Sequence, residues 1–557
     1  MTIAQYILHC LKKHGCHHIF GVPGTSCAGI YNAVDADPDH DIKYLVTVSE
    51  LEAGYIADGY GRFAPMSAVC VSYGVGNLSM INAIASAYTE KVPMIVLNGG
   101  PTKSEQRDQD NYSILFSHST GRPNADLEIY KHVTVAAEIL TDMSTAQELI
   151  SGLFKKATQT PGPVYLEVAN NLWDTQITTI EEEDEPVDDI VDPAAVDAFF
   201  NKLYNKTSRP AQPVILLGSE ICRRGLADLA LSVIEHFNIP FCTTLLSKSV
   251  ISESHPLFIG TYDSDLVNKP PRRYAESSDC FIALGCVFGI DHGSLVKKQF
   301  DLMVDVSYGN ARIGPVGFEN VSLKSFLEGL LSHKQTQSLK AGESAALDTQ
   351  KLLRKESVKP THDTVFKSIN KFLSDKGDQM LMVADTCLSS YPASDLQMPS
   401  TRMFLANPVW LSIGQGTPAS IGAHLATGKR PLIVSGDGGF QMIAQTFSTM
   451  VKYKIPCIIA VIDNGLYGIE QFLLDKKFYT DPAAPSIGFN SLNRWKYELF
   501  PEIFGGGKGF RVADTEKFYE TLEEAFAYND GPVIIAVEVN PKDIPTEYVK
   551  KIERLKL

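Results

Sequence analysis

The sequence predicts an α/β protein built from three doubly wound domains with mostly parallel sheets. The chain has 557 residues, enough for about three domains. Two polar stretches divide it into three segments of similar size. Each segment alternates short apolar runs with stretches of helix length, a pattern typical of parallel strands covered by helices on both faces.

The two polar stretches mark the expected domain boundaries. The first, 178–193, is strongly acidic, and the second, 333–356, is rich in Gln, Ser, Lys and Ala. Both compositions are typical of solvated connectors. We therefore expect domains at 1–177, 194–332 and 357–557.

The apolar runs give the positions of the expected strands. They are 68–72, 93–97 and 164–168 in the first segment, 214–217 and 281–284 in the second, and 381–384, 432–434, 458–462 and 533–539 in the third. Gly162-Pro163-Val164 and Gly531-Pro532-Val533 open the last run of the first and third segments. This echo is compatible with two outer domains built alike around a different, Rossmann-like middle domain.

Composition argues against several classes of protein. The formal net charge of −15 lacks the basic footprint of a nucleic-acid-binding protein. No apolar run reaches the length of a membrane span, and residues 1–15 lack the apolar core and cleavage site of a signal peptide. The ten cysteines form no C-x-x-C pair and show no zinc spacing, as expected of reduced thiols. We therefore expect a cytoplasmic protein without nucleic-acid or membrane partners.

A candidate metal site follows two strands of the third segment. Gly436-Asp437-Gly438 comes directly after the run 432–434, and Asn464 follows the run 458–462. Glycines at a strand end let the backbone approach a phosphate, and the next helix N-terminus favours an anion. Asp437, Asn464 and a backbone carbonyl just beyond it offer the hard oxygens that Mg²⁺ prefers.

This spaced pattern resembles the fingerprint of thiamine-diphosphate-dependent enzymes, which opens with Gly-Asp-Gly and closes with Asn. The resemblance implies that the cofactors are thiamine diphosphate and Mg²⁺. It also implies two sets of contacts: Asp437, Asn464 and the carbonyl of Leu466 for Mg²⁺, and the backbone of Gly438, Gly439 and Ile469 for the diphosphate.

Glu50 is the counterpart of this motif in the first segment. An isolated glutamate is usually a surface charge, but the sequence around this one, including 53–60, resembles the family. On that resemblance Glu50 is the cofactor-activating glutamate. Burial against the aminopyrimidine ring would raise its pKa and let it share a proton with the ring nitrogen. The cofactor would then perform the carbon chemistry.

A third part of the resemblance is the turn Leu411-Ser412-Ile413-Gly414. Taken alone, it is a helix-entry turn. In the family, a large apolar side chain at the place of Ile413 wedges between the two cofactor rings and brings the reacting atoms together. The carbonyl of Leu411 would accept a hydrogen bond from the exocyclic amine, and Ser412 belongs to the same contact. Thr386 also falls where the family contacts the cofactor.

The resemblance covers nearly the whole chain and is greatest to pyruvate and indolepyruvate decarboxylases. It implies a homodimer or homotetramer with sites at the dimer interface, where Glu50 and the Gly-Asp-Gly motif come from different subunits. Gly218 and Gly225 of the middle segment lie in a phosphate-loop-like setting. Some relatives bind FAD or an effector there, whereas we expect a purely structural Rossmann-like domain.

Glu470 favours a decarboxylase. It lies six residues after Asn464 and matches the glutamate that handles the substrate carboxylate and protonates the intermediate in pyruvate-type decarboxylases. The alternative is a surface i,i+4 pair on the following helix.

Two other positions depart from the decarboxylase pattern. Thr25 stands in place of a catalytic aspartate, and the pair His118-Ser119 stands where the family has two histidines. Hydroxyl groups cannot transfer protons near pH 7 as Asp and His do. We expect His118 to keep part of the catalytic role; a structural surface histidine is the alternative.

Three hypotheses follow. A nonoxidative 2-oxo acid decarboxylase would protonate the enamine intermediate and release an aldehyde, as Glu470 favours. A carboligase of the acetolactate or acetoin type would add the enamine to a second carbonyl, as Thr25 and Ser119 favour. A noncatalytic cofactor-binding protein is the third, against which Glu50 and Asp437 argue. The tail from residue 541 is either a mobile lid or a surface helix.

Overall fold

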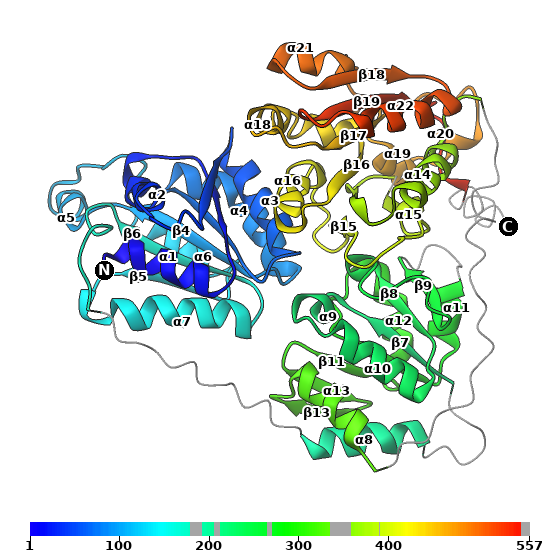
Figure 1. The fold of residues 1–557 in the computed structure, drawn as a ribbon, viewed down its shortest axis with the longest axis horizontal. Helices are drawn as coiled ribbons and strands as arrows, with labels where there is room; N and C mark the ends of the chain where they lie inside the picture. Colours follow the sequence, from blue (N-terminus) through cyan, green and yellow to red (C-terminus); the bar gives the residue numbers. More distant parts are fainter. Residues whose placement is uncertain (179–191, 205–211, 264–269, 335–357, 389, 547–557) are drawn as a thin grey trace. The chain divides into compact units, whose positions relative to one another are not determined.

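The described residues form three β-sheets whose strands alternate with helices along the chain, which confirms the predicted α/β fold class (Figure 1). The computed structural model describes residues 1–178, 192–204, 212–263, 270–334, 358–388 and 390–546. Most of both predicted connectors, 178–193 and 333–356, and the last part of the C-terminal tail lie outside these ranges. The chain divides into an N-terminal unit, comprising Met1–Pro186, Thr417–Gly428 and Ile443–Ile455, and a C-terminal unit made of the rest.

The first sheet has six parallel strands in the order β2-β1-β3-β4-β6-β5. Its strands are β1 (His18–Gly21), β2 (Lys43–Val46), β3 (Ser67–Ser72), β4 (Met94–Gly100), β5 (Ala136–Leu140) and β6 (Pro163–Ala169). The helices of this segment are α1 (Ile3–Lys13), α2 (Ala28–Asp35), α3 (Glu50–Gly61), α4 (Val75–Thr89), α5 (Lys103–Tyr112), α6 (Ala125–Tyr130) and α7 (Ala146–Gln159). One face of the strands packs against α1, α2 and α7, and α3 and α4 contact the sheet as well.

The third sheet repeats this design, with six parallel strands in the order β15-β14-β16-β17-β19-β18. Its strands are β14 (Met380–Ala384), β15 (Phe404–Ala406), β16 (Arg430–Gly436), β17 (Ile458–Asp463), β18 (Lys508–Val512) and β19 (Val533–Glu538). The helices of this segment are α14 (His362–Lys376), α15 (Ser390–Ala393), α16 (Gly416–Thr427), α17 (Asp437–Gln441), α18 (Thr446–Lys452), α19 (Gly468–Leu474), α20 (Lys477–Thr480), α21 (Phe500–Phe504) and α22 (Thr515–Ala527). Counted along the chain, the strand order is the same as in the first sheet.

The middle sheet is different and mixed. Its seven strands run in the order β13-β12-β11-β10-β7-β8-β9, and the pairs β11–β12 and β12–β13 are antiparallel. The strands are β7 (Pro213–Leu217), β8 (Phe241–Thr244), β9 (Phe258–Tyr262), β10 (Cys280–Leu284), β11 (Val304–Ser307), β12 (Asn310–Ile313) and β13 (Val316–Glu319). The helices are α8 (Pro193–Tyr204), α9 (Ser219–Arg223), α10 (Ala227–Phe237), α11 (Pro270–Ser277), α12 (Gly293–Gln299) and α13 (Leu323–Ser332).

Close backbone contacts fix α3, the helix that begins at Glu50. A Cβ atom on Gly59 would lie 2.0 Å from the carbonyl oxygen of Ala419, and one on Gly422 would lie 1.9 Å from that of Ile56. Only glycine permits so close an approach of two helices. Within the N-terminal unit, α3 is therefore held against α16 at a defined crossing.

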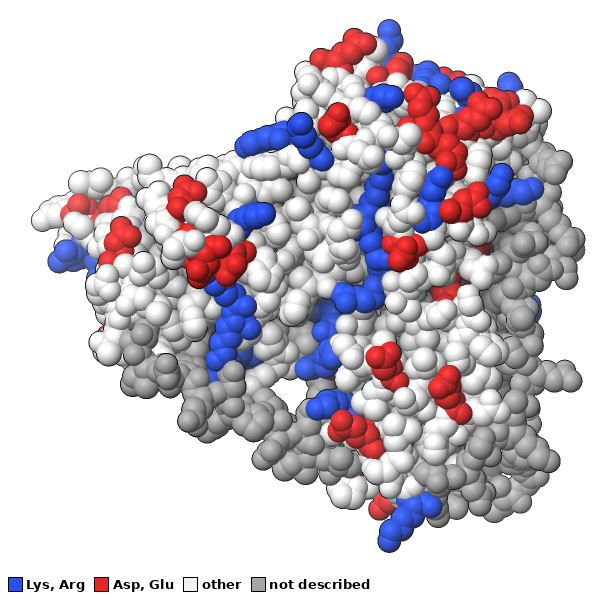
Figure 2. Space-filling view, in the orientation of Figure 1, with Lys and Arg blue, Asp and Glu red and all other residues white. Residues whose placement is uncertain are grey.

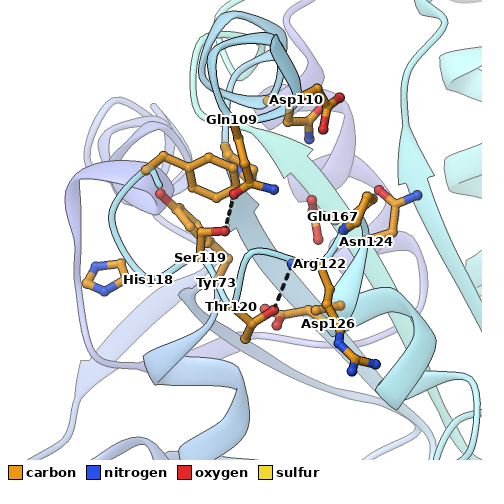
Figure 3. A pocket seen from close by; sticks show the side chains of 15 residues that line it. Tyr73, Gln109, Asp110, His118, Ser119, Thr120, Arg122, Asn124, Asp126 and Glu167 are labelled. Atoms are coloured by element: carbon orange, nitrogen blue, oxygen red, sulfur yellow. Dashed lines mark hydrogen bonds between the residues drawn. The ribbon is translucent and has the colours of Figure 1, made fainter. Parts of the chain in front are cut away.

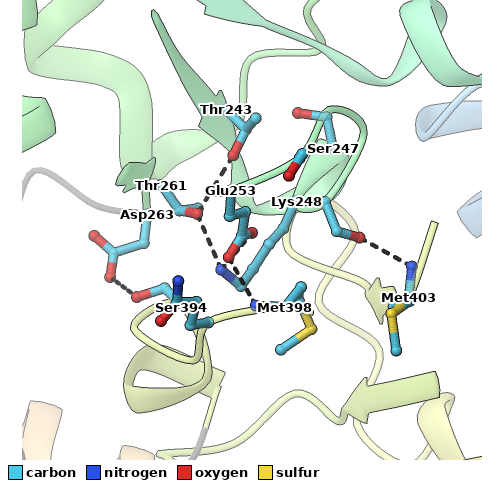
Figure 4. A network of polar contacts seen from close by, with 12 residues as sticks. Thr243, Ser247, Lys248, Glu253, Thr261, Asp263, Ser394, Met398 and Met403 are labelled. Carbon is cyan, nitrogen blue, oxygen red and sulfur yellow. Dashed lines mark hydrogen bonds and ion pairs between the residues drawn. The ribbon is translucent and has the colours of Figure 1, made fainter. Parts of the chain in front are cut away.

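A buried polar network ties the middle domain to the segment before β15 within the C-terminal unit (Figure 4). Lys248 Nζ lies 2.8 Å from Glu253 Oε1, and the two side chains are 1% and 2% exposed. The other oxygen of Glu253 accepts a hydrogen bond from the Met398 N–H at 2.9 Å. The hydroxyl of Ser249 accepts one from the Met403 N–H at 3.0 Å. Both charges of the ion pair are thus fully desolvated.

Surface charges of both signs are interspersed where α22 lies (Figure 2). Lys517 pairs with Glu520 on this helix at 3.0 Å, and both side chains are largely exposed. None of the helices within the described ranges is long and apolar enough to cross a lipid bilayer.

Replacing one member of the buried pair is expected to be costly. Lys248→Met should lower the free energy of unfolding by about 3–5 kcal/mol, because it leaves the Glu253 carboxylate buried without its partner. The double variant Lys248→Met/Glu253→Met should lose much less, since no charge remains unpaired. Lys517→Met is the exposed control and should change stability by less than about 1 kcal/mol. Urea unfolding measures all three, and a double variant that loses as much stability as Lys248→Met, or more, would contradict this expectation.

Candidate active site

The carboxyl edge of the third sheet gathers most of the predicted cofactor-binding residues. Thr386 follows β14, Asp437 follows β16 and Asn464 follows β17. These three strands are neighbours and parallel, so their carboxyl ends meet at one edge, where open α/β sheets bind ligands. These residues therefore meet because each lies in the turn directly after one of three neighbouring strands.

One cavity at this edge is lined by most of the residues that the sequence predicts. The predicted residues in its lining are Thr386, Ile413, Asp437, Gly438, Gly439, Asn464, Leu466 and Ile469. Leu411 and Ser412 do not belong to this lining, although they directly precede Ile413. The set lies entirely within the C-terminal unit.

Asp437 is the most perturbed group of the cavity. Its side chain is buried, with 2% of the residue exposed. Burial raises the pKa of Asp437 to about 7, although its carboxylate accepts hydrogen bonds from the N–H groups of Gly465, at 2.6 Å, and Gly438, at 3.0 Å. The nearby charge of Asp463 also raises this pKa. A bound cation would offset these costs and favour the carboxylate.

The glycines after β16 leave a space that no other residue would leave. A Cβ atom on Gly438 would lie 2.5 Å from the ring of Tyr467, and one on Gly439 would lie 2.7 Å from Asp385 Oδ2. Asn464 adds a side chain that is 6% exposed, and its Oδ1 accepts a hydrogen bond from the Leu466 N–H at 3.0 Å. The residues present fit a phosphate and a hard divalent cation, because they combine a bare backbone with oxygen ligands.

Asp385 organises this edge, and the sequence reasoning missed it. Its buried carboxylate accepts hydrogen bonds from the N–H groups of Gly414 and Gly416, both at 3.1 Å, and from the Ser435 hydroxyl at 2.6 Å. Burial raises the pKa of Asp385, and these hydrogen bonds counteract the rise. The available signal was an aspartate directly after a wholly apolar strand. Such a carboxylate needs partners once it is buried.

The turn before α16 is strained at Leu411. This residue has φ of 61° and is 44% exposed. Left-handed backbone is unusual for a branched residue and is concentrated at functional sites. The following N–H, that of Ser412, donates to Asn407 Oδ1 at 2.8 Å.

Glu50 is the first residue of α3, at the carboxyl edge of the first sheet. Ser49 caps this helix, and its hydroxyl accepts a hydrogen bond from the Glu52 N–H at 3.3 Å. Glu50 is half-buried and lies beside Gly76, where a Cβ atom would come within 3.6 Å of Glu50 Cγ. It belongs to the N-terminal unit, whereas Asp437 belongs to the C-terminal unit.

Glu52, one residue beyond Leu51 on the same helix, has a different environment. It is fully buried and accepts a hydrogen bond from the Val48 N–H at 2.9 Å. Burial raises the pKa of Glu52, and Thr449 and Thr446 of α18 lower it. Glu52 is therefore a structural carboxylate, and the half-buried Glu50 is the one that a ligand can reach.

A second cavity, of about 260 Å³, lies in the N-terminal unit (Figure 3). His118, Ser119, Tyr73, Asp126 and Glu167 belong to its lining. The Ser119 hydroxyl donates to Gln109, and the Glu167 carboxylate accepts from the Tyr165 hydroxyl at 2.7 Å. Burial raises the pKa of Glu167. In Figure 3 the His118 ring lies apart from the Glu167 carboxylate.

The backbone at His118 is also strained. Its φ is 65°, and it lies so close to Gly74 that a Cβ atom there would be 2.5 Å from the His118 carbonyl oxygen. Thr25 begins a short 3-10 turn (Thr25–Cys27) after β1, in the same unit. Thr25, Glu50 and Tyr73 follow β1, β2 and β3, so these turns share the carboxyl edge of the first sheet.

Glu470 does not line the cavity of the C-terminal unit. It lies in the first turn of α19 and is exposed. Neighbouring Ile469 does line the cavity. The structure of one unit thus brings the predicted metal and diphosphate ligands together, while Glu470 faces solvent and Glu50 and His118 belong to the other unit.

Three domain models of one class of enzyme match most of the chain. Residues 1–120 match the model described as thiamine pyrophosphate enzyme, N-terminal TPP binding domain. Residues 202–314 match the central domain of the same enzymes, and residues 386–537 match their C-terminal TPP binding domain. The two TPP binding domains contain Glu50 and Asp437, respectively.

Similarity to individual proteins is low but extends over nearly their full length. Pyruvate decarboxylase 1 of Pisum sativum is 26% identical, over 95% of this chain and 88% of the pea protein. Pyruvate decarboxylase of Kluyveromyces lactis is 25% identical, over 99% of this chain and 98% of its own. Indole-3-pyruvate decarboxylase of Azospirillum brasilense is 25% identical, over 95% and 93%.

Proposed function

Because the chain belongs to the thiamine pyrophosphate enzyme family, as a distant relative of pyruvate and indolepyruvate decarboxylases, we propose that it is a Mg²⁺-dependent 2-oxo acid decarboxylase. It removes CO₂ without oxidation and releases an aldehyde. The observation that carries this proposal is the cavity in which Asp437, Asn464 and Ile413 meet. Its oxygen donors, bare glycine backbone and apolar wall suit a metal diphosphate with an organic ring beside it.

The proposed cofactor contacts follow from the chemical type of each residue. Asp437, Asn464 and the Leu466 carbonyl hold Mg²⁺; Gly438, Gly439 and Ile469 present backbone to the diphosphate. When bound, thiamine diphosphate supplies a nucleophilic carbon and stabilises the charge that departing CO₂ leaves behind. The further cofactor contacts are Thr386, Leu411, Ser412 and Ile413.

The remaining residues have proposed acid–base roles. Glu50 holds a proton at the aminopyrimidine end of the cofactor, where a half-buried carboxyl can exchange it. His118 and Glu470 act on the substrate side. The strained backbone of His118 supports its role, and a second subunit would cover the exposed Glu470.

We propose that the enzyme is a homodimer, or a homotetramer built from such dimers, with sites between two copies. Apolar side chains near Glu50 are exposed: Val48 by 49%, Val75 by 57% and Leu78 by 38%. A second copy seated beside Glu50 would remove this apolar surface from water.

A carboligase is the second candidate. Thr25 and Ser119 cannot supply protons near pH 7, and the Ser119 hydroxyl is already engaged with Gln109. Slow protonation gives a second carbonyl compound time to react with the activated substrate. This candidate shares every cofactor contact with the first and differs only in the carbon product.

The product assay tests the proposal directly. The protein, incubated with Mg²⁺, thiamine diphosphate and a series of 2-oxo acids from pyruvate to indolepyruvate, should release one aldehyde for each CO₂ from at least one of them. Acetoin or acetolactate from pyruvate without free acetaldehyde would favour the carboligase instead. Failure to release CO₂ from any 2-oxo acid would contradict both candidates.

Two neighbouring glutamates give a matched pair of variants. Glu50→Gln should lower kcat about 100-fold or more, because the amide cannot exchange a proton with the cofactor. Glu52→Gln should retain activity within about threefold, since Glu52 is buried away from any ligand and keeps its hydrogen bond to Val48 as the amide. Steady-state kinetics measure both, and equal losses would argue against a special role for Glu50.

Metal binding should depend on pH through Asp437. Its pKa is raised to about 7 in the metal-free protein, so a proton competes with Mg²⁺ below that pH, and affinity should fall about tenfold for each pH unit. Calorimetric titration with Mg²⁺ at pH 6 and pH 8, with thiamine diphosphate present, measures the dependence. Asp437→Asn is the control, because it keeps the titration of the diphosphate but removes that of the carboxyl. Equal pH dependence in both proteins would refute the assignment.

A further inference from the structure

A histidine that the sequence reasoning left without a role lines the cavity of the C-terminal unit. His362 is the first residue of α14 and is 1% exposed. It shares the cavity lining with Asp437, Ile413 and Ile469. Because residues that directly follow β14, β16 and β17 share this lining, the N-terminus of α14 lies at the carboxyl edge of the sheet. An imidazole therefore lies in the wall of the proposed cofactor site.

Asp543 holds this imidazole in one orientation. Its Oδ2 lies 2.8 Å from His362 Nδ1 and accepts a hydrogen bond from the His362 backbone N–H at 2.7 Å. A carboxylate beside Nδ1 favours the tautomer that carries the hydrogen there. The other ring nitrogen, Nε2, is then available to a group in the cavity. A histidine oriented by a carboxylate is a common arrangement for proton transfer.

The proposed reaction requires such a group. Conversion of a 2-oxo carboxylate to an aldehyde and CO₂ takes up one proton, which becomes the aldehyde hydrogen. Thr25 and Ser119 cannot donate it near pH 7, so His118 and Glu470 have fewer acid–base partners than the corresponding groups of a pyruvate-type decarboxylase. Within the described part of the C-terminal unit, His362 is the one histidine in the lining of the cavity.

We propose, resting on the decarboxylase function above, that His362 is a catalytic residue that donates this proton. In the doubly protonated imidazolium the Nε2–H bond breaks, and a C–H bond forms with the electron pair that CO₂ leaves on the substrate carbon. The ring is left neutral, with its hydrogen on Nδ1 beside Asp543. Water then returns a proton to Nε2. Asp543 is a positioning residue, because it acts only through His362. The pair replaces, from the C-terminal domain, the acid–base groups that are altered in the N-terminal one.

A purely structural role of His362 would give a different experimental result, and a neighbouring contact provides the control. The segment after β19 is also tied to α14 by Asp363, whose carboxylate accepts from the hydroxyl of Thr546 and, at 3.2 Å, from its N–H. Lys542 adds hydrogen bonds to carbonyl oxygens of the 481–484 loop. If His362 only anchored this segment, loosening the Asp363–Thr546 contact would have the same effect as removing the imidazole.

The experiment compares three variants of the full-length protein. His362→Gln and Asp543→Asn act on the pair, and Thr546→Val weakens the neighbouring anchor. We measure aldehyde formation from the best 2-oxo acid, the affinity of the cofactor-free protein for thiamine diphosphate with Mg²⁺ by tryptophan fluorescence, and the midpoint of thermal unfolding.

His362→Gln should lower aldehyde formation about 100-fold, in the range of a lost general acid, and Asp543→Asn about tenfold. Cofactor affinity should change less than about threefold in both, and Thr546→Val should keep full activity. Activity of His362→Gln within twofold of wild type would overturn the inference. So would equal losses in Thr546→Val, or a loss of cofactor affinity as large as the loss of rate. A wild-type protein that decarboxylates no 2-oxo acid would instead contradict the proposed function, and this inference with it.

Discussion

The buried carboxylate of Asp385 is the interaction on which the carboxyl edge of the third sheet depends. It joins the end of β14 to the turn that carries Ile413, through the N–H groups of Gly414 and Gly416, and to the end of β16 through Ser435. Without it, two turns that arise far apart in the sequence would have no common anchor. Its burial is unfavourable by itself, and the hydrogen bonds it accepts make it tolerable. The cavity is thus shaped by a residue that does not line it.

The interior strands could be predicted from the sequence because parallel strands covered on both faces are continuous apolar runs. The predicted runs around 68–72, 432–434 and 458–462 all lie in strands at the centre of a sheet. Several strands that escaped prediction, such as β5, β15 and β18, lie at sheet edges. The interior strands β1, β8 and β11 escaped as well, because each has only four residues and includes polar ones. One face of an edge strand meets solvent, so its residues are mixed, as in Lys508–Val512. The hairpin of the middle sheet was missed for the same reason.

The site shows a similar limit. That Asp437, Asn464 and the glycines meet in one cavity was predictable, because metal and phosphate chemistry restricts both residue type and spacing in the motif that they resemble. Asp385 and His362 were not, because their partners, Ser435 and Asp543, are distant in sequence and only the fold brings them together. Buried carboxylates recur throughout the molecule, and burial raises the pKa of Glu52, Glu167 and Asp437 alike. The sequence does not show which carboxylates are buried, because the formal net charge of −15 counts buried and exposed groups alike.

The identical strand order of the first and third sheets has a historical consequence. Counted from the start of each domain, Glu50 follows the second strand, whereas Asp437 follows the third. One ancestral sheet, duplicated within a gene, would give two copies of the order, and the turns at the carboxyl edges could then diverge freely. Turns can exchange residues without altering which strands pair. One copy could therefore acquire Glu50 and the other Asp437, so that two halves with the same strand order came to carry different carboxylates at their edges.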